Sequence, residues 1–204
     1  MKIGIIGSGM IGGTAAKLFV KAGNEVAISN SRGPQTLKEL VTPLGPAARA
    51  TTVEEAIAFG DVILVAIPLK DYSSLPAEAL KGKIVVDAMN YYPQRDGQLN
   101  FGNHSSSGFL AQHLPGASVV KAFNTMWYKT LGEEGKPGEP LENRLVLFVA
   151  GDDPEAKAIV SKLIEDIGFA PVDTGSLDEG GKRQEPGAPI YNNPLTPAQA
   201  RNLL

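Results

Sequence analysis

The chain has 204 residues, 43% of them hydrophobic and 20% charged, so it can bury a core, and we expect one domain with at most a short appendage. A formal net charge of −3 argues against a nucleic-acid partner, and the absence of cysteine excludes disulfides, thiolate catalysis and cysteine zinc sites. With no apolar run near the roughly 18 residues of a membrane span and no signal-peptide pattern at the N-terminus, we expect a cytoplasmic protein without a membrane or metal partner.

The first predicted elements are a strand, a glycine-rich loop and a helix. Lys2–Ile6 is a short, mostly apolar run with the length of a buried strand, and apolar residues recur at helical spacing over 14–22. Between them, Gly7, Gly9 and Gly12 form the pattern G-x-G-x-x-G, which in this setting is typical of dinucleotide binding. Gly7 permits the tight turn, Gly9 lets a pyrophosphate approach the backbone, and Gly12 lets the helix pack closely. The positive end of the helix dipole then attracts the phosphates.

Strands and helices alternate along most of the remaining chain. Capping signals mark three helix starts, at Thr52 with Glu55, at Asp153 before Pro154, and at Thr196 with Gln199. Residues 62–67 form a continuous apolar run, as expected of a central parallel strand covered on both faces. We predict strands at 25–29, 48–51, 62–67, 83–88, 118–123, 144–150 and 170–173, helices at 35–41, 52–60, 73–80, 105–114 and 154–167, and a mobile surface loop over 128–143.

This order of elements predicts the fold class. Repeated strand–helix units indicate an α/β protein with a Rossmann-type, doubly wound, mostly parallel sheet. We expect residues 1–174 to form the dinucleotide-binding domain and residues 175–204 to form a C-terminal loop and short helix that pack on the same domain.

The end of the second predicted strand indicates which dinucleotide binds. An NAD site places Asp or Glu there to hold the ribose hydroxyls. This chain has Asn30, Ser31 and Arg32 instead, and a guanidinium can hold a 2′-phosphate that a carboxylate would repel. We therefore predict an NADP(H) site.

Five motifs along the chain form a recognisable set. They are Gly7-Ser8-Gly9-Met10-Ile11-Gly12, Asn30-Ser31-Arg32, Ala66-Ile67-Pro68, Asp87-Ala88-Met89-Asn90 and Val119-Val120-Lys121-Ala122-Phe123-Asn124-Thr125. Together they resemble the coenzyme F420-dependent NADP oxidoreductase family, and the reductase domains of STEAP metalloreductases show a similar pattern. The resemblance covers residues 1 to about 173, and its most specific part is the run Val-Lys-Ala-Phe-Asn-Thr.

The resemblance implies roles for matching positions. Ser8, Met10 and Ile11 would lie along the pyrophosphate, and Asn30, Ser31 and Arg32 would hold the 2′-phosphate. Ala66, Ile67 and Pro68 would line the path to the nicotinamide. Its ribose and ring would lie beside Ala88 and Asn90. The second substrate would stack on a floor formed by Phe123, Asn124 and Thr125.

The sequence contains no evident catalytic acid or base. There is no Tyr-x-x-x-Lys pair, and His104 and His113 are the only histidines. This absence fits hydride transfer to a deazaflavin such as F420 or to a flavin, where the protein mainly holds two rings face to face. Trp127, Tyr91 and Tyr92 are candidates for a stacking surface, with ordinary packing as the alternative.

Two other functions stay open. One is an NADPH-dependent reductase of another small molecule, such as a hydroxyacid or pyrroline-carboxylate type dehydrogenase. Such enzymes need a long helical second domain, whereas this chain returns to strand at 145–150. The other is a non-catalytic NADPH sensor. We also expect a homodimer, with the apolar terminal segment 195–204 as a candidate interface.

Overall fold

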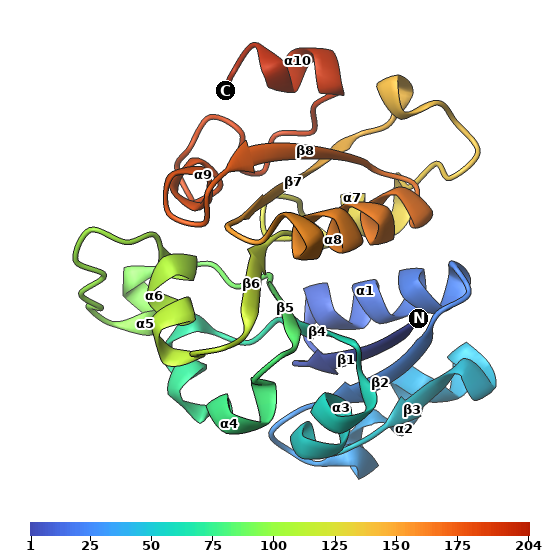
Figure 1. Ribbon diagram of the computed structural model, residues 1–204. Helices are drawn as coiled ribbons and strands as arrows, with labels where there is room; N and C mark the ends of the chain where they lie inside the picture. The colour runs from blue at the N-terminus through green and yellow to red at the C-terminus, as the bar shows by residue number, and fades with distance from the viewer.

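The computed structural model describes residues 1–204 and contains one eight-stranded sheet with the order β3-β2-β1-β4-β5-β6-β7-β8 (Figure 1). All neighbouring strands run parallel except β6 and β7, which are antiparallel. This arrangement confirms the predicted Rossmann-type, mostly parallel sheet. The strands are β1 (Lys2–Ile6), β2 (Glu25–Ser29), β3 (Ala48–Ala50), β4 (Val62–Val65), β5 (Ile84–Asp87), β6 (Ser118–Lys121), β7 (Val146–Gly151) and β8 (Ala170–Gly175).

Helices cover both faces of the sheet, and short turns connect them. The α-helices are α1 (Met10–Lys21), α2 (Lys38–Val41), α3 (Val53–Phe59), α4 (Ala77–Leu80), α5 (Pro93–Asp96), α6 (Ser106–His113), α7 (Tyr128–Glu133), α8 (Pro154–Asp166), α9 (Glu179–Arg183) and α10 (Pro197–Arg201). The 3₁₀ turns are η1 (Pro34–Leu37), η2 (Thr42–Ala47), η3 (Leu69–Ser74) and η4 (Leu141–Asn143). No helix is both long enough and apolar enough to cross a membrane.

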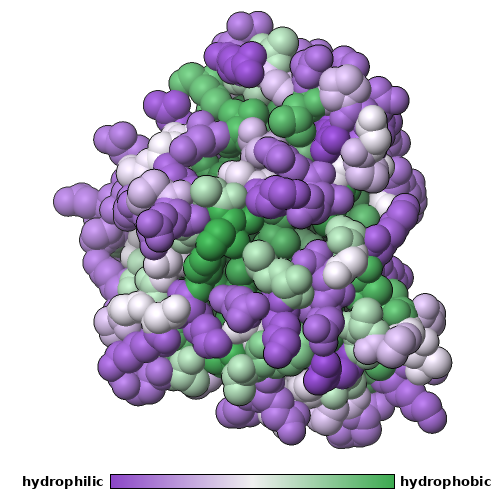
Figure 2. Space-filling view, turned by 45° about the vertical axis from the view of Figure 1, so that its right-hand side comes forward, coloured by the Kyte–Doolittle hydropathy of each residue, from purple (hydrophilic) through white to green (hydrophobic).

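The core is split by the sheet into two layers. Val62 and Leu64 of β4 point to the layer under α1, α7 and α8, while Ile63 and Val65 point to the layer under α3, α4 and α6. This alternation follows from the two-residue period of a strand, and it explains why β4 is apolar at every position. The face shown in Figure 2 is mostly hydrophilic, with apolar side chains gathered in a hollow across its middle.

The C-terminal segment 176–204 covers β7 and β8. Leu195 and Ala200 are buried with Ile190 against Val146 and Phe148. The side chain of Gln199 caps α10 by accepting a hydrogen bond from the Thr196 N–H at 2.9 Å. The apolar face of the terminal helix is therefore used within the chain, and of the large apolar side chains in the predicted interface only Leu203 and Leu204 stay exposed.

Several predicted boundaries were wrong for local physical reasons. The first helix begins at Met10 rather than at residue 14, directly after the glycine loop. Pro76 separates η3 from α4, so the predicted helix 73–80 is two short turns. The strand predicted to reach residue 123 ends at Lys121, because Phe123 has a positive φ of 66° that breaks the extended backbone.

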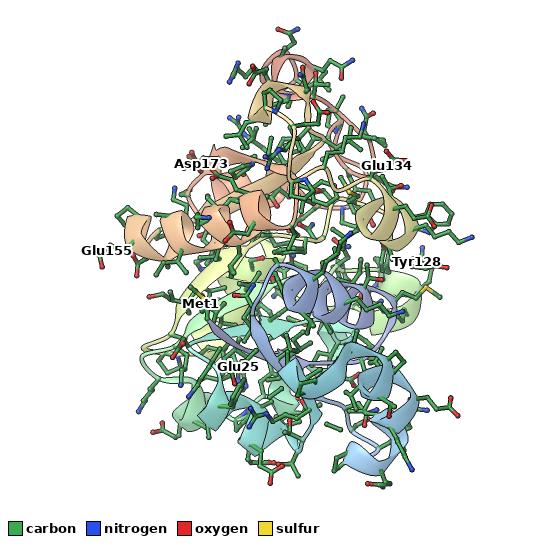
Figure 3. All side chains as sticks on the ribbon, turned by 90° about the vertical axis from the view of Figure 1, so that its right-hand side faces the viewer. Met1, Glu25, Tyr128, Glu134, Glu155 and Asp173 are labelled. Carbon is green, nitrogen blue, oxygen red and sulfur yellow. The ribbon has the colours of Figure 1, made fainter.

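The predicted surface loop 128–143 contains the helix α7. Tyr128 and Glu134 lie at its two ends in Figure 3, and the helix packs beside α1. Leu131 is fully buried in the core layer that α1 and α8 share. One apolar side chain at the right position thus anchors a segment whose composition is otherwise typical of a loop.

Candidate functional site

Two cavities lie at the carboxyl ends of the central strands and share Ala66, Ile67 and Pro68, so they form one continuous cleft. Each has a volume of about 500 Å³, and we name them the glycine-loop cavity and the aromatic cavity. Residues that line only the glycine-loop cavity include Gly7, Ser8, Gly9, Asn30, Ser31, Arg32 and Asp71. Those that line only the aromatic cavity include Met10, Ile11, Ala88, Asn90, Tyr92, Arg95, Asn124, Met126, Trp127, Tyr128 and Tyr191.

The three glycines of the loop differ in what surrounds them. Gly7 has a φ of +106°, and a Cβ at Gly12 would lie 1.9 Å from the Gly7 carbonyl oxygen. The backbone therefore requires glycine at both positions. Gly9 is exposed, and a Cβ there would have no protein atom within 4 Å. Gly9 is the N-cap of the 12-residue helix α1, and no side chain caps that end. The free N–H groups at the start of α1 and the open space above Gly9 fit a phosphate-bearing dinucleotide.

The wall beside the glycine loop holds a free cation. Asn30 donates to Ser8 Oγ at 3.1 Å, and its Oδ1 accepts the backbone N–H of Arg32 at 2.9 Å, so the end of β2 is tied to the loop. Arg32 is exposed, and its guanidinium makes no hydrogen bond or ion pair within the chain. The Asp71 carboxylate lies in the same cavity but comes from η3, not from β2. Asn30, Ser31 and Arg32, which carry no negative charge, fit the 2′-phosphate of NADP(H).

Replacing Arg32 with alanine is expected to weaken NADPH binding by roughly 10- to 100-fold and to leave NADH binding nearly unchanged. A charge-assisted hydrogen bond contributes about 1.5–3 kcal/mol, and each 1.4 kcal/mol is about tenfold in affinity. Fluorescence titration with both dinucleotides measures the difference. Equal losses for NADPH and NADH would contradict a 2′-phosphate role for Arg32.

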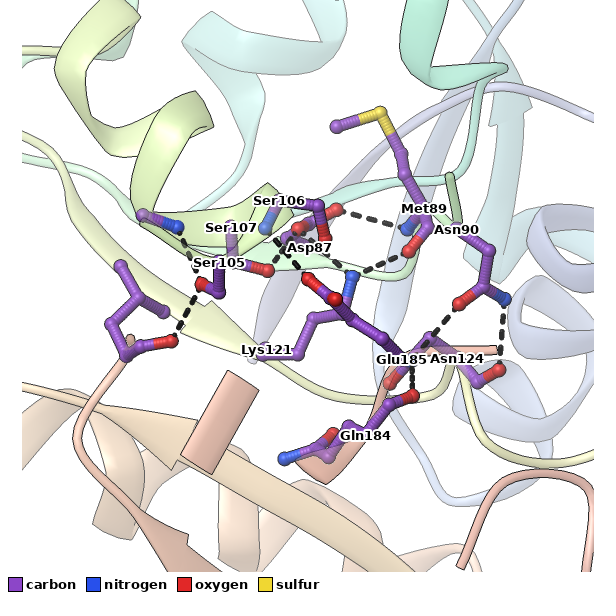
Figure 4. Close-up of polar contacts among 12 residues, drawn as sticks. Asp87, Met89, Asn90, Ser105, Ser106, Ser107, Lys121, Asn124, Gln184 and Glu185 are labelled. Atoms are coloured by element: carbon purple, nitrogen blue, oxygen red, sulfur yellow. Dashed lines mark hydrogen bonds and ion pairs between the residues drawn. The ribbon is translucent and has the colours of Figure 1, made fainter. Parts of the chain in front are cut away.

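The floor of the aromatic cavity is a network of amides (Figure 4). Asn90 Nδ2 donates to the Asn124 carbonyl at 2.9 Å, and Asn124 Nδ2 donates to Asn90 Oδ1 at 3.0 Å and to the Gln184 carbonyl at 2.7 Å. Asn124 is 4% exposed, and its Oδ1 has no partner in the chain. An orphaned buried acceptor in a cavity wall fits a ligand that brings an N–H group, such as the carboxamide of a nicotinamide.

A buried ion pair supports this floor from below. Lys121 Nζ lies 3.2 Å from Asp87 Oδ2 and donates to the Met89 carbonyl at 2.5 Å, and both side chains are almost completely buried. Ser107 Oγ and the Met89 N–H also donate to the Asp87 carboxylate. The pair therefore fixes the turn that carries Ala88 and Asn90.

Two tyrosines and an arginine form the opposite wall. The hydroxyls of Tyr92 and Tyr191 share a hydrogen bond, and Tyr191 also accepts from Asn90 Nδ2 at 3.4 Å. Burial and the bond to Tyr92 raise the pKa of Tyr191 well above its usual range, so its hydroxyl stays protonated. Arg95 lies 5.0 Å from the centre of the Tyr92 ring. Burial opposes ionisation of Asp96, but hydrogen bonds from Arg95 and the Tyr92 N–H outweigh it and keep the pKa of Asp96 below its usual value.

Most residues predicted for the site line the cleft, and three do not. Gly12 lies beneath it, where it lets α1 pack against the loop. The prediction that Phe123 and Thr125 form a stacking floor is corrected by their burial. Phe123 is fully buried and packs edge-on against Phe19 at 5.8 Å, and Thr125 is 4% exposed and uses its carbonyl to hold the Asn192 N–H. Of the floor motif, only Asn124 reaches the cavity.

Sequence reasoning missed several lining residues. Arg95 follows the tyrosine pair of the 90–93 turn, and Tyr128 follows the predicted Trp127. Both could have been found because they are close in sequence to residues already predicted for the site. Tyr191 and Asn192 lie in a segment without periodicity or motif, and only the fold brings them to the cavity. Tyr91 turns away from the cleft and packs against Phe101.

The fold and the cleft together define a Rossmann-type dinucleotide-binding protein of the oxidoreductase class. A family model described as "NADP oxidoreductase coenzyme F420-dependent" matches residues 2–91. The crystal structure of hypothetical protein SMa0349 from Sinorhizobium meliloti has a TM-score of 0.84 and 33% identity, covering 96% of this chain and 95% of that one. A candidate F420-dependent NADP-reductase from Arthrobacter sp. FB24 has a TM-score of 0.73 and 27% identity, covering 87% and 86%.

The chain also resembles part of larger curated proteins. It is 38% identical to the metalloreductase STEAP3 of Rattus norvegicus over 178 residues, which are 86% of this chain and 34% of the relative. The chain thus spans about a third of the length of these curated relatives. These findings agree with the resemblance seen in the sequence motifs. Residues 2–91 therefore match the F420-dependent NADP oxidoreductase family, and this match together with the NADP-reductase neighbour supports NADP(H) as the dinucleotide.

Proposed function

We propose that the protein transfers a hydride between NADP(H) and a flat, conjugated ring acceptor of the deazaflavin (F420) or flavin kind. The observation that carries the proposal is the continuity of the cleft. A phosphate cradle and the free Arg32 lie at one end, and an aromatic cavity lies at the other, joined at Ala66, Ile67 and Pro68. One cleft can therefore hold a dinucleotide and a second ring side by side.

The chain's own residues would bind and orient both molecules. NADPH, when bound, supplies the hydride. The N–H groups at the start of α1 and the Arg32 guanidinium would hold its phosphates, and Asn124 Oδ1 would accept from its carboxamide. Trp127 and Met10 are 51% and 67% exposed at the rim of the aromatic cavity, where they would cover an acceptor ring and exclude water.

NADPH oxidation by the purified protein tests the proposal, with oxidised F420 in one reaction and FMN in another. We expect turnover with at least one of them, and the preferred acceptor identifies the ring class. NADPH binding without turnover of either acceptor would contradict the proposal and favour another small-molecule reductase or a sensor.

The proposal includes a homodimer and a cytoplasmic location, as expected from the sequence. Static light scattering tests the assembly, and a monomer mass at micromolar concentration would contradict the dimer.

A further inference from the structure

The aromatic cavity presents hydrogen-bond donors that the chain does not use. The Tyr92 and Tyr191 hydroxyls have two hydrogens between them, and the bond that they share uses only one. Neither hydroxyl donates to any other group of the chain, so one O–H in the cavity has no acceptor. Arg95 donates to Asp96 and to the Asn90 carbonyl through Nε and one terminal nitrogen, which leaves its other terminal nitrogen free.

The charges in this cavity favour a ligand with acceptor atoms. Arg95 is the only charged residue that lines it, and Asp96, the partner of Arg95, is buried outside the lining. A free hydroxyl hydrogen and a free guanidinium nitrogen match a carbonyl oxygen or a ring nitrogen, above all one that gains negative charge. A ligand edge that carries only donors would leave the free hydroxyl hydrogen and the free guanidinium nitrogen without acceptors.

The hydroxyl pair is held in place from both sides of the cleft. Ile190 is 1% exposed, and the Asn192 N–H donates to the Thr125 carbonyl at 2.8 Å, so the residues on either side of Tyr191 are anchored. Tyr92 precedes α5, and its N–H donates to the Asp96 carboxylate at 2.9 Å. The 90–93 turn and the C-terminal segment therefore hold the tyrosine pair in a fixed position in the cavity wall.

We propose that the Tyr92–Tyr191 pair binds the carbonyl or imine edge of the ring acceptor and that Tyr92 gives its proton to that edge as the hydride arrives. This inference rests on the proposed function and names the acceptor class as conjugated carbonyl compounds, which include flavins, deazaflavins and quinones. Tyr92 and Tyr191 are then catalytic and binding residues that no sequence motif marks.

At a carbonyl edge, the acceptor gains the hydride of NADPH, a hydrogen nucleus with two electrons, at one ring atom. Its C=O π bond breaks, and the electron pair moves to the oxygen. The Tyr92 O–H bond breaks and an O–H bond forms on the acceptor. The Tyr92 oxygen keeps its electron pair and receives a hydrogen bond from the protonated Tyr191. The positive charge of Arg95 lies 5.0 Å from the centre of the Tyr92 ring. A solvent proton then restores Tyr92, so the sum consumes one hydride and one proton.

Tyr92→Phe and Tyr191→Phe, each made in the full chain, test the pair. The matched control is Tyr72→Phe, because Tyr72 packs against Phe109 and His113 and its hydroxyl makes no hydrogen bond. The first readout is equilibrium binding of FMN and of 2-methyl-1,4-naphthoquinone to protein saturated with NADP⁺. The second is anaerobic NADPH oxidation with each probe between pH 6 and pH 9.

We expect either substitution to weaken probe binding by about 3- to 10-fold, as the loss of one neutral hydrogen bond predicts. Tyr92→Phe should lower turnover by about 100-fold, the low end for a proton donor, because Tyr191 can still donate. NADPH affinity and all properties of Tyr72→Phe should match the wild type.

Each outcome separates the two proposals. Turnover and probe binding that neither substitution changes would overturn the tyrosine pair and leave the proposed hydride transfer standing. A wild-type protein that binds neither probe also overturns the pair. Probe binding that depends on Tyr92 and Tyr191, without wild-type turnover of either F420 or FMN, would support the subsite and contradict the proposed function.

Discussion

Gly9→Val is expected to weaken NADPH binding by roughly 100- to 10,000-fold without unfolding the protein. A side chain at Gly9 would have no protein atom within 4 Å, so it would occupy the open space above the loop. That space lies at the uncapped N-terminus of α1, where phosphate oxygens would meet the free N–H groups. Losing two charge-assisted hydrogen bonds costs about 3–6 kcal/mol, and each 1.4 kcal/mol is about tenfold in affinity.

The backbone at Gly9 tolerates valine. Its φ of −70° and ψ of −164° are extended values that a β-branched residue adopts readily. The less favourable helix cap costs under about 1 kcal/mol. Titration with NADPH and thermal unfolding of the same sample measure affinity and stability separately.

Gly12→Ala provides the matched control, because the reverse result is expected there. A Cβ at Gly12 would lie 1.9 Å from the Gly7 carbonyl oxygen, so α1 must move away from the loop. We expect a loss of about 3 kcal/mol or more in the free energy of unfolding. If Gly9→Val binds NADPH normally, the phosphate cradle is not at Gly9. If it unfolds as readily as Gly12→Ala, the backbone at Gly9 does not tolerate valine.

These two glycines show how far the sequence alone can specify the site. The repeated strand–helix units predicted the fold class, and because the first strand, the glycine loop and the first helix are adjacent in the chain, a local pattern was enough to predict one half of the cleft. The same holds for the end of β2, where Asn30, Ser31 and Arg32 follow the strand directly. The glycine pattern also predicted open space at Gly9 and close helix packing at Gly12, and the structure has both.

The other half of the cleft depends on contacts between distant segments. Tyr191 meets Tyr92 across 99 residues of sequence, and Asn124 meets Gln184 across 60. Neither tail residue belongs to a periodic pattern, so no local signal marked them. Phe123 was misjudged because the motif does not reveal that this residue has a positive φ, with its phenyl ring in the core and Asn124 at the cavity.

Lys121→Met is expected to lower the free energy of unfolding by about 3–5 kcal/mol, because it leaves the Asp87 carboxylate buried without its cation. Both side chains of this pair are at most 1% exposed, so water cannot replace the lost partner. For a domain of this size the loss corresponds to about 6–20 °C in Tm. The Met89 carbonyl also loses its donor, so acceptor turnover should fall together with stability.

Two further variants show whether burial causes this loss. Lys157→Met breaks an ion pair with Asp173, whose side chain is 58% exposed, and should cost at most about 1 kcal/mol. Asp87→Asn added to Lys121→Met removes the stranded charge while keeping an acceptor for the Met89 N–H at 2.9 Å, so part of the stability should return. If Lys121→Met is no less stable than Lys157→Met, the pair does not stabilise the floor of the cleft. The same conclusion follows if the double variant is less stable than Lys121→Met alone. Recovery in the double variant would instead show that the chain keeps Lys121 to neutralise Asp87, which in turn fixes the turn that carries Asn90.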